Sequence, residues 1–334
     1  MNTIRSRRRI GLAVGIVLVV VLSAASLFIG SNPLPPGRVM HLLLNPGDGF
    51  DTTVIYAQRI PRTILVILVG AALGTAGALM QSLTRNPLAD PGILGVNAGA
   101  SLAVVVSVAV AGITGIWFYL WFAFAGAALA SVFVYVLGGG GSHSASPVRL
   151  ALAGVAVTMA ISSIVQVVIL SDQNAFNEFR LWATGSVENR GWPVVTAVVG
   201  FIVLGLVLAC VSAPALNAVA LGDEQGTSLG VNVVRLRAMV MLAVTVLAGA
   251  ATAAVGPIMF IGLGVPYIAR AVCGPDQRWM IPFSALCAPV VMLVADLMAR
   301  TVIAPQEIQT GIITTIIGGP FFIAIVRRRR IEAL

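Results

Sequence analysis

Apolar segments of about 20 residues, the length that crosses a membrane as one helix, make up most of this sequence. The predicted spans cover residues 10–30, 63–83, 93–111, 117–137, 148–170, 192–210, 238–255, 258–270, 281–299 and 308–326. Only 10% of the residues are charged, whereas soluble proteins carry about 25%. We therefore predict an all-α integral membrane protein with ten transmembrane helices, in one transmembrane domain that covers residues 1–334.

Helix breakers accompany two of the predicted spans. Gly256-Pro257 stands between the seventh and eighth spans, and Gly318-Gly319-Pro320 lies within the last one. Breakers at membrane depth are tolerated where the backbone is buried in protein or lines a cavity, so broken helices are expected at both places. The polar stretch 211–237 is predicted to form two short interfacial helices, with a solvated loop as the alternative.

The distribution of arginine predicts how the spans are oriented. Fourteen of the 20 arginines fall on the side that holds both chain ends in the ten-span prediction. Because basic residues are enriched in cytoplasmic loops, both termini are predicted to be cytoplasmic. Residues 10–30 are expected to be a retained span rather than a signal peptide, because the apolar run is longer than a signal core. A short interfacial helix is expected near residues 39–44.

The sequence contains no lysine, and this excludes several kinds of chemistry. A P-loop needs a lysine on the nucleotide phosphates, so any ATP hydrolysis must come from a partner. The arginines are dispersed rather than grouped with aromatic residues, which argues against a nucleic-acid partner and favours contact with membrane lipid. Cys210, Cys273 and Cys287 are scattered, and only His41 and His143 supply imidazole, so no metal site is expected.

Five stretches of the sequence resemble one known family. They read RIPRT (59–63), ALMQSLTRNPLADPGILGVNAGAS (78–101), LALAGVA (150–156), VGPIMFIGLGVPYIAR (255–270) and GGPFFIAIVRRRR (318–330). In these motifs the chain resembles the FecCD-type ABC importer permeases, the iron-siderophore and vitamin B12 permease family. The wording is nearest to the ferric-catecholate siderophore permeases, and the likeness covers essentially the whole length.

The resemblance implies a type II ABC importer permease in the cytoplasmic (inner) membrane of a bacterium. The expected partners are a second permease subunit, identical or a sibling, two ATPase subunits and an extracytoplasmic substrate-binding protein. This chain would need no cofactor, since ATP and Mg²⁺ would be held by the ATPase subunits. The expected cargo is an iron-siderophore complex carried by alternating access, with haem or a corrinoid as alternatives.

The resemblance also implies which arginines meet the binding protein. Arg59 and Arg62 match the family's RxPR pair, and Arg300 matches the arginine that ends the ninth span. Snorkelling to lipid phosphates is the alternative for all three, and an i,i+4 ion pair with Asp296 is the further alternative for Arg300. Pro61 is typical of the first turn of a helix, and the helix dipole disfavours arginine at that end. The presence of Arg59 and Arg62 there therefore favours a functional role for both residues.

Two further groups of residues carry implied roles on the cytoplasmic side. The coupling loop 211–237 corresponds to helices that fit a cleft on the ATPase, with Leu221, Gly222, Asp223 and Glu224 as expected contacts. The turn 85–92 and the junction 146–147 match loops that narrow the inner mouth of the path. The expected gate residues are Asn86, Leu88, Ser146 and Pro147; a helix-capping turn that touches nothing is the alternative.

One observation limits the residue roles that the resemblance implies, and another argues against a rival class of transporter. The family often reads PHxAR where this chain has Tyr267 at the second position, so no titrating imidazole is expected there. The rival class is an ion-coupled secondary transporter, which would place ionisable residues near the bilayer midplane. Here the acidic residues cluster in loops and at span ends, which argues against that class.

Overall fold

The computed structural model describes residues 2–112, 115–139 and 147–327, and every regular element in these ranges is a helix. The all-α prediction is confirmed. The helices are α1 (Asn2–Phe28), α2 (Pro36–Leu44), α3 (Phe50–Thr53), the π-helix η1 (Val54–Arg59), α4 (Ile60–Thr84), the 3₁₀ helix η2 (Pro91–Leu94), α5 (Val96–Ala111), α6 (Ile116–Leu137), α7 (Pro147–Ser171), α8 (Gln173–Ala183), α9 (Trp192–Val219), α10 (Asp223–Ser228), α11 (Val233–Val255), α12 (Ile261–Cys273), α13 (Gln277–Thr301) and α14 (Thr310–Arg327).

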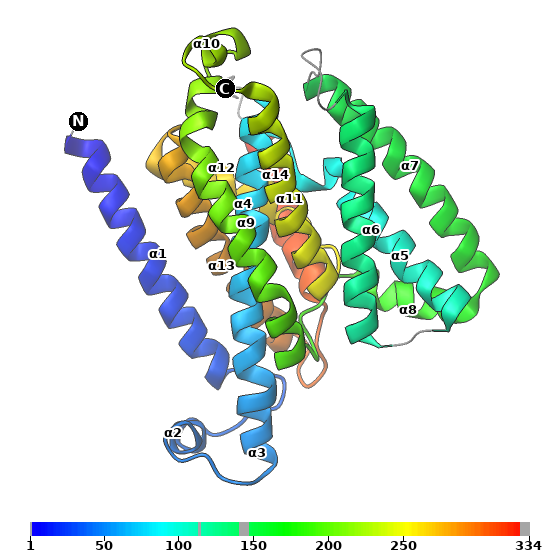
Figure 1. Ribbon diagram of the computed structural model, residues 1–334. Coiled ribbons are helices and arrows are strands. Elements are labelled where there is room, and N and C mark those ends of the chain that lie inside the picture. Colours follow the sequence, from blue (N-terminus) through cyan, green and yellow to red (C-terminus); the bar gives the residue numbers. More distant parts are fainter. Residues whose placement is uncertain (1, 113–114, 140–146, 328–334) are drawn as a thin grey trace.

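Seven of the described helical segments are long and apolar enough to cross a membrane. They belong to α1, α3 to α4, α6, α7, α9, α11 and α13. Shorter apolar helices of 10–17 residues lie in α5, α12 and α14. The chain is thus an all-helical, multi-pass membrane protein. Figure 1 shows α2 and α3 at one end of the bundle and α10 at the other; we call these the α2 end and the α10 end.

Helix α4 forms the centre of the bundle, and α9, α11, α12 and α13 pack against it (Figure 1). In the most apolar 18-residue stretch of each span, 78% of the residues are buried in the Phe50–Thr84 segment that contains α4, and 83% are buried in α11. The corresponding shares are only 11% in α1 and 17% in α7, so these two helices must face lipid or another subunit. Small residues allow the central helices to approach closely. A Cβ on Gly77 would lie 1.8 Å from the carbonyl oxygen of Gly262. Gly77 therefore allows α4 and α12 to pack closely, as small residues do between membrane helices.

The start of the α4 span differs from the prediction. Residues from Phe50 onward are helical through α3, η1 and α4, so Arg59 and Arg62 lie inside a continuous helix rather than at its first turn. Pro61 is tolerated because the π-helix just before it shifts the hydrogen bonds to i→i−5, as in Ile60 N to Ile55 O. The expectation of an unfavourable dipole at these two arginines was therefore wrong.

Four other segments correct the predicted spans. Helix α9 continues to Val219, so the stretch after residue 210 contains one short helix, α10, rather than two. Helix α14 is continuous across Gly318-Gly319-Pro320, since Pro320 is accommodated within the helix. The third span begins at Val96 and not at residue 93, because Gly95 adopts φ 72° after the 3₁₀ turn η2 and interrupts the helix. Helix α12 runs from Ile261 to Cys273, three residues later than predicted.

Candidate functional site

The three arginines expected to dock the binding protein lie together at the α2 end. They come from η1, α4 and α13, and all three are buried: Arg59 is 4% exposed, Arg62 8% and Arg300 1%. They line one small pocket of about 50 Å³. Its other lining residues are Gly30, Ser31, Asn32, Val54, Gln58 and Glu307. The structure therefore brings the arginines of η1 and α4 together with that of α13, which is far from them in the sequence.

Two carboxylates neutralise part of this charge. Asp296 is fully buried, and its Oδ1 accepts from Arg62 Nε at 3.0 Å and Nη2 at 2.8 Å. Its Oδ2 pairs with Arg300, so the i,i+4 ion pair that was the alternative for Arg300 is present. Glu307 accepts from Arg62 Nη1 at 2.7 Å. Removing one member of a buried pair costs about 3–5 kcal/mol, because the remaining charge stays buried.

Arg59 and Arg300 also bind the C-terminal end of α1. The last carbonyl groups of a helix have no partner within it, and they carry the negative end of its dipole. Arg59 donates to the carbonyl oxygens of Leu27 (2.7 Å), Phe28 (3.2 Å) and Asn32 (2.6 Å), and Arg300 donates to those of Ser26 (3.1 Å) and Ile29 (3.4 Å). The cluster thus fastens α1 to the rest of the bundle.

Positive charge remains in excess in this cluster. Three guanidinium groups face two carboxylates, Asp296 and Glu307. Arg300 Nε is buried and has no hydrogen-bond partner among the described residues. An anionic oxygen that entered the pocket would be attracted by this excess of positive charge.

The loop between α8 and α9 places another charged pair near the cluster. Burial raises the pKa of Glu188, as does repulsion from Glu307, while Arg62 and Arg190 lower it to a smaller extent. Burial lowers the pKa of Arg190 to about 10. Neither residue was singled out from the sequence, and nor was Glu307, because all three stand in segments without helical periodicity.

The residues expected to meet the ATPase lie at the α10 end. Leu221 is 67% exposed and Glu224 is exposed. Gly222, at φ 127°, precedes α10 in a backbone conformation that favours glycine. Asp223 is the first residue of α10, and its two carboxylate oxygens accept from Arg85 at 2.6 Å and from Arg237 at 2.5 Å.

Two of the four expected gate residues, Asn86 and Leu88, follow the C-terminal end of α4. Arg85 ends α4 with φ 50°, and Asn86 is exposed. Asn86 Oδ1 accepts from the backbone N–H of half-buried Leu88 at 2.9 Å, which closes a local turn. Pro147 begins α7, and Ser146 lies outside the described residues.

Beyond this turn the chain enters the bundle. Asp90 Oδ1 accepts from Gly92 N at 2.7 Å, and burial raises the pKa of Asp90. The η2 turn then packs against α7 so closely that a Cβ on Gly154 would lie 1.8 Å from the carbonyl oxygen of Ile93. The α4–η2 turn therefore connects the α10 end to the middle of the bundle.

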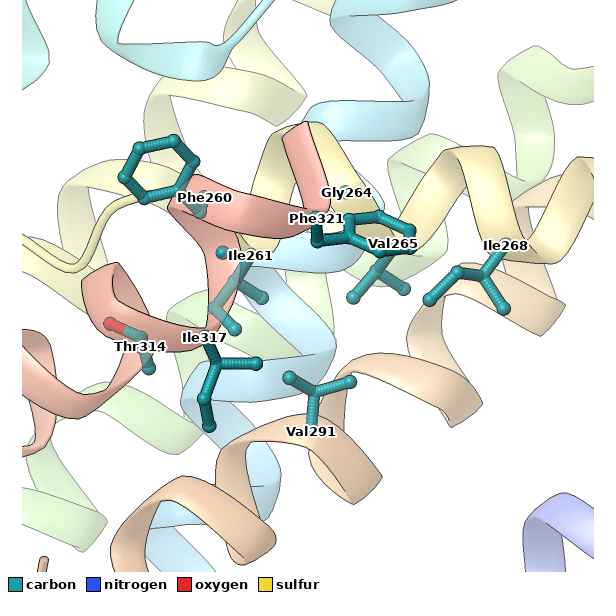
Figure 2. Close-up of a pocket in the computed structure, with 10 residues that line it drawn as sticks. Phe260, Ile261, Gly264, Val265, Ile268, Val291, Thr314, Ile317 and Phe321 are labelled. Atoms are coloured by element: carbon teal, nitrogen blue, oxygen red, sulfur yellow. The ribbon is translucent and has the colours of Figure 1, made fainter. Parts of the chain in front are cut away.

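An apolar cavity of about 120 Å³ lies between α12, α13 and α14 (Figure 2). Phe260, Ile261, Val265, Ile268, Val291, Ile317 and Phe321 line it, and the hydroxyl of Thr314 is bonded to Gly311 O at 2.9 Å. Ligand sites usually measure about 300–1,000 Å³. This cavity is too small for a chelate. Within the described part of the chain, no group of three His, Cys, Asp or Glu residues could hold a metal ion.

Comparisons with known proteins identify the family of this chain. A model of the FecCD transport family matches residues 17–328. The chain is 41% identical to the ferric enterobactin transport system permease protein FepD of Escherichia coli (strain K12), over 94% of both chains. It is 35% identical to the iron(3+)-hydroxamate import system permease protein FhuG of Bacillus subtilis (strain 168), over 98% of this chain and 99% of that one.

Two further likenesses concern cargo and fold. The chain is 34% identical to the hemin transport system permease protein HmuU of Yersinia pestis, over 98% of both chains. A solved structure of a metal-chelate type ABC transporter in an inward-facing conformation superimposes with a TM-score of 0.79 at 24% identity. That match covers 96% of this chain and 99% of the other, so the two share a fold.

Proposed function

Because the chain belongs to the FecCD transport family, we propose that it is the permease subunit of an ATP-driven ABC importer that carries an iron-siderophore complex into the cell. The observation that carries this proposal is the 41% identity to a ferric enterobactin permease over 94% of both chains. A catecholate chelate of iron(III) is accordingly the first cargo to test. Haem is the second candidate, since a hemin permease is 34% identical over 98% of both chains; a corrinoid is the third.

In this proposal ten helices cross the cytoplasmic membrane, with both termini in the cytoplasm. Ten crossings would need the three shorter apolar helices in α5, α12 and α14 to cross the membrane together with the seven long apolar segments. The fourteen arginines on the side of the chain ends support this orientation through the positive-inside rule. The α2 end then faces outward and the α10 end faces the cytoplasm.

The binding protein would dock at the α2 end, on the pocket lined by Arg59, Arg62 and Arg300. The excess of positive charge there supports a partner that presents a carboxylate. Glu307 already occupies one side of the pocket, on Arg62. A docking carboxylate would therefore add to an existing ion-pair cluster rather than meet three free arginines.

The ATPase would contact the α10 end through Leu221, Gly222, Asp223 and Glu224. The exposure of Leu221 and Glu224 supports this, because a flat contact needs an apolar anchor and polar groups around it. ATP and Mg²⁺ would be held by two such ATPase subunits. The gate would be formed by Asn86, Leu88, Ser146 and Pro147, at the cytoplasmic ends of α4 and α7.

The path for the chelate would lie between two permease subunits, identical or siblings, and would open alternately to the two sides. Helix α7 is available for such a contact, because only 17% of the residues in its most apolar 18-residue stretch are buried.

The proposal is tested by reconstituting the permease with its ATPase and binding protein in proteoliposomes. Uptake of ferric enterobactin, ferric hydroxamate, hemin and cobalamin is measured with ATP enclosed. We expect ATP-dependent uptake of the catecholate chelate. Uptake that proceeds without ATP and collapses with an uncoupler would instead identify an ion-coupled secondary transporter. ATP-dependent uptake of hemin or cobalamin alone would correct the cargo.

A further inference from the structure

We infer that Asp223 is a positioning residue that ties the ATPase-facing helix α10 to the end of α4, so that α10 and the α4–η2 turn move together. The inference rests on the proposed function, because it assigns the route by which events at the ATPase reach the expected gate. It also gives Asp223 a role in addition to the proposed ATPase contact.

The first observation is the bonding of the Asp223 carboxylate. One oxygen accepts from Arg85 Nη2 at 2.6 Å, and the other accepts from Arg237 Nη2 at 2.5 Å. The same Arg85 nitrogen donates to the carbonyl oxygen of Val219, the last residue of α9, at 2.7 Å. Arg85 thus holds both sides of the turn that connects α9 to α10. A carboxylate shared by two guanidinium groups is held more firmly than one in a single surface pair, because several charges form a network.

A second set of bonds reaches α4 independently. Asn217, in the last turn of α9, donates to Asp276 Oδ1 at 2.7 Å and accepts from Gln277 N at 2.9 Å. Gln277 Oε1 in turn accepts from the Ser82 hydroxyl of α4 at 2.7 Å. The segment that leads to α10 is therefore attached to the last turns of α4 by two routes, through Arg85 and through Gln277.

The position of Arg85 gives these contacts a consequence. Arg85 ends α4 in the left-handed conformation, and the next residue is Asn86, the first expected gate residue. A displacement of α10 is transmitted through Asp223 to Arg85 and then to Asn86, over a few covalent and ionic links. A coupling route needs such a contiguous physical connection, and direct evidence of coupling must come from perturbing it.

The neighbouring residues of α10 are arranged differently. Leu221 and Glu224 are exposed, whereas Asp223 turns its carboxylate toward α4 and α11. This separates two functions within one short segment. Leu221 and Glu224 face a partner, and Asp223 connects the segment to the permease core.

The test uses a cysteine at Asn86 as a reporter of the gate turn in the complete complex. The rate of maleimide labelling at Asn86→Cys is measured in proteoliposomes without nucleotide and with ATP plus vanadate, and ATP hydrolysis is measured in the same samples. Cys210, Cys273 and Cys287 are replaced by alanine in every sample, because Cys210 is exposed and would also react with maleimide. This background is otherwise unaltered, or carries Asp223→Asn, Arg85→Gln or both. Arg235→Gln is the matched control, because Arg235 is an exposed arginine close to Arg237 on α11.

We expect the labelling rate to change about fivefold or more with nucleotide in the reporter background and in the Arg235→Gln control. In Arg85→Gln, which lies outside the proposed ATPase contact, this change should be lost while ATP hydrolysis continues. Asp223→Asn should lose the change as well, and the double variant should be no worse than either single one. Asp223→Glu, which keeps the charge, should restore part of the response. If the Asp223→Asn complex does not assemble, Arg85→Gln removes the same ion pair from the other side.

Two results would overturn the inference: no nucleotide-dependent labelling in the reporter background, or a response in Arg85→Gln equal to that of Arg235→Gln. Failure of the proposed function looks different, since it would show as absent ATP-dependent uptake of ferric enterobactin by the wild-type complex. The labelling assay needs no cargo and decides the inference by itself.

Discussion

Arg62 on α4 and Asp296 on α13 form a buried ion pair, with Arg62 Nη2 2.8 Å from Asp296 Oδ1. The two residues are 234 positions apart, and Asp296 is fully buried. The pair lies at the α2 end of the two helices that pack most extensively in the bundle, and the same carboxylate also binds Arg300. One carboxylate thus joins the central helix to α13 and forms ion pairs with two of the three arginines in the pocket.

Loss of this carboxylate should destabilise the protein strongly. Asp296→Asn leaves Arg62 and Arg300 buried without the charge that both of them use, so we expect a loss of about 3–5 kcal/mol in stability. Thermal unfolding of the purified permease in detergent measures the effect. Asp51→Asn is the control, because the Asp51–Arg38 pair is exposed and worth about 0–1 kcal/mol. Equal melting temperatures for the two variants would contradict a structural role for Asp296.

Gly77 should tolerate no side chain. Alanine there would place Cβ 1.8 Å from the carbonyl oxygen of Gly262, so α4 and α12 would have to separate. We expect Gly77→Ala to lower the yield of folded protein sharply. Gly200→Ala on α9 is the matched control: no atom lies within 4 Å of its added Cβ. Because alanine favours helix by about 0.5–1 kcal/mol over glycine, that variant should be neutral or slightly stabilised.

Asp90 should give the stability a specific pH dependence. Burial raises its pKa above the ordinary value of 3.8, so the folded protein favours the protonated form. The stability associated with Asp90 is therefore fully present below the unfolded-state pKa and decreases as the pH rises through the folded-state pKa. Asp90→Asn keeps an oxygen to accept from Gly92 N and removes the titration.

We therefore expect the melting temperature of wild type, relative to Asp90→Asn, to fall as the pH rises from about 4. Parallel melting curves for the two proteins at all pH values would contradict this. Asp90→Ala, which also removes the cap, should be less stable than Asp90→Asn at every pH by about 0.5–2 kcal/mol.

The sequence predicts contacts that depend on local spacing better than contacts between distant segments. The four-residue separation of Asp296 and Arg300 suffices to suggest their ion pair. Nothing local indicates that Arg62 shares the same carboxylate, because that contact exists only once α4 packs on α13. Glu307 was missed for the same reason. It stands in a segment without periodicity, and its role is visible only from its ion pair with Arg62 in the folded structure.

Helix breakers misled the prediction in both directions. Pro61 suggested a helix start, but the π-helix before it and the indole of Trp192, which donates to Tyr56 O at 2.9 Å, let the helix continue. Pro320 suggested a break, yet α14 is continuous. Gly95 was overlooked, although its φ of 72° interrupts the start of α5. Whether a breaker breaks a helix depends on tertiary partners that single-sequence reasoning does not supply.

Arg59 offers the sharpest test of docking at the α2 end. Its side chain binds carbonyl oxygens of α1 and no carboxylate among the described residues, so neutralising it leaves the Asp296 cluster intact. Arg59→Gln can still donate to one of those carbonyls, and we expect the complex to assemble. If a carboxylate of the binding protein enters the pocket, its affinity should fall about tenfold, the usual scale for one charge-assisted hydrogen bond.

Arg38→Gln is the matched control, since Arg38 is an exposed arginine of α2 at the same end of the molecule. Surface plasmon resonance of the loaded binding protein on the permease complex, at 50 and 300 mM salt, measures both variants. Docking through the pocket predicts a large loss for Arg59→Gln, a small loss for Arg38→Gln, and a weaker salt dependence for Arg59→Gln than for wild type, because one charge contact is gone. Equal losses in the two variants would mean that the binding protein responds to the overall charge of the α2 end, and Arg59 would then serve only to hold α1 in place.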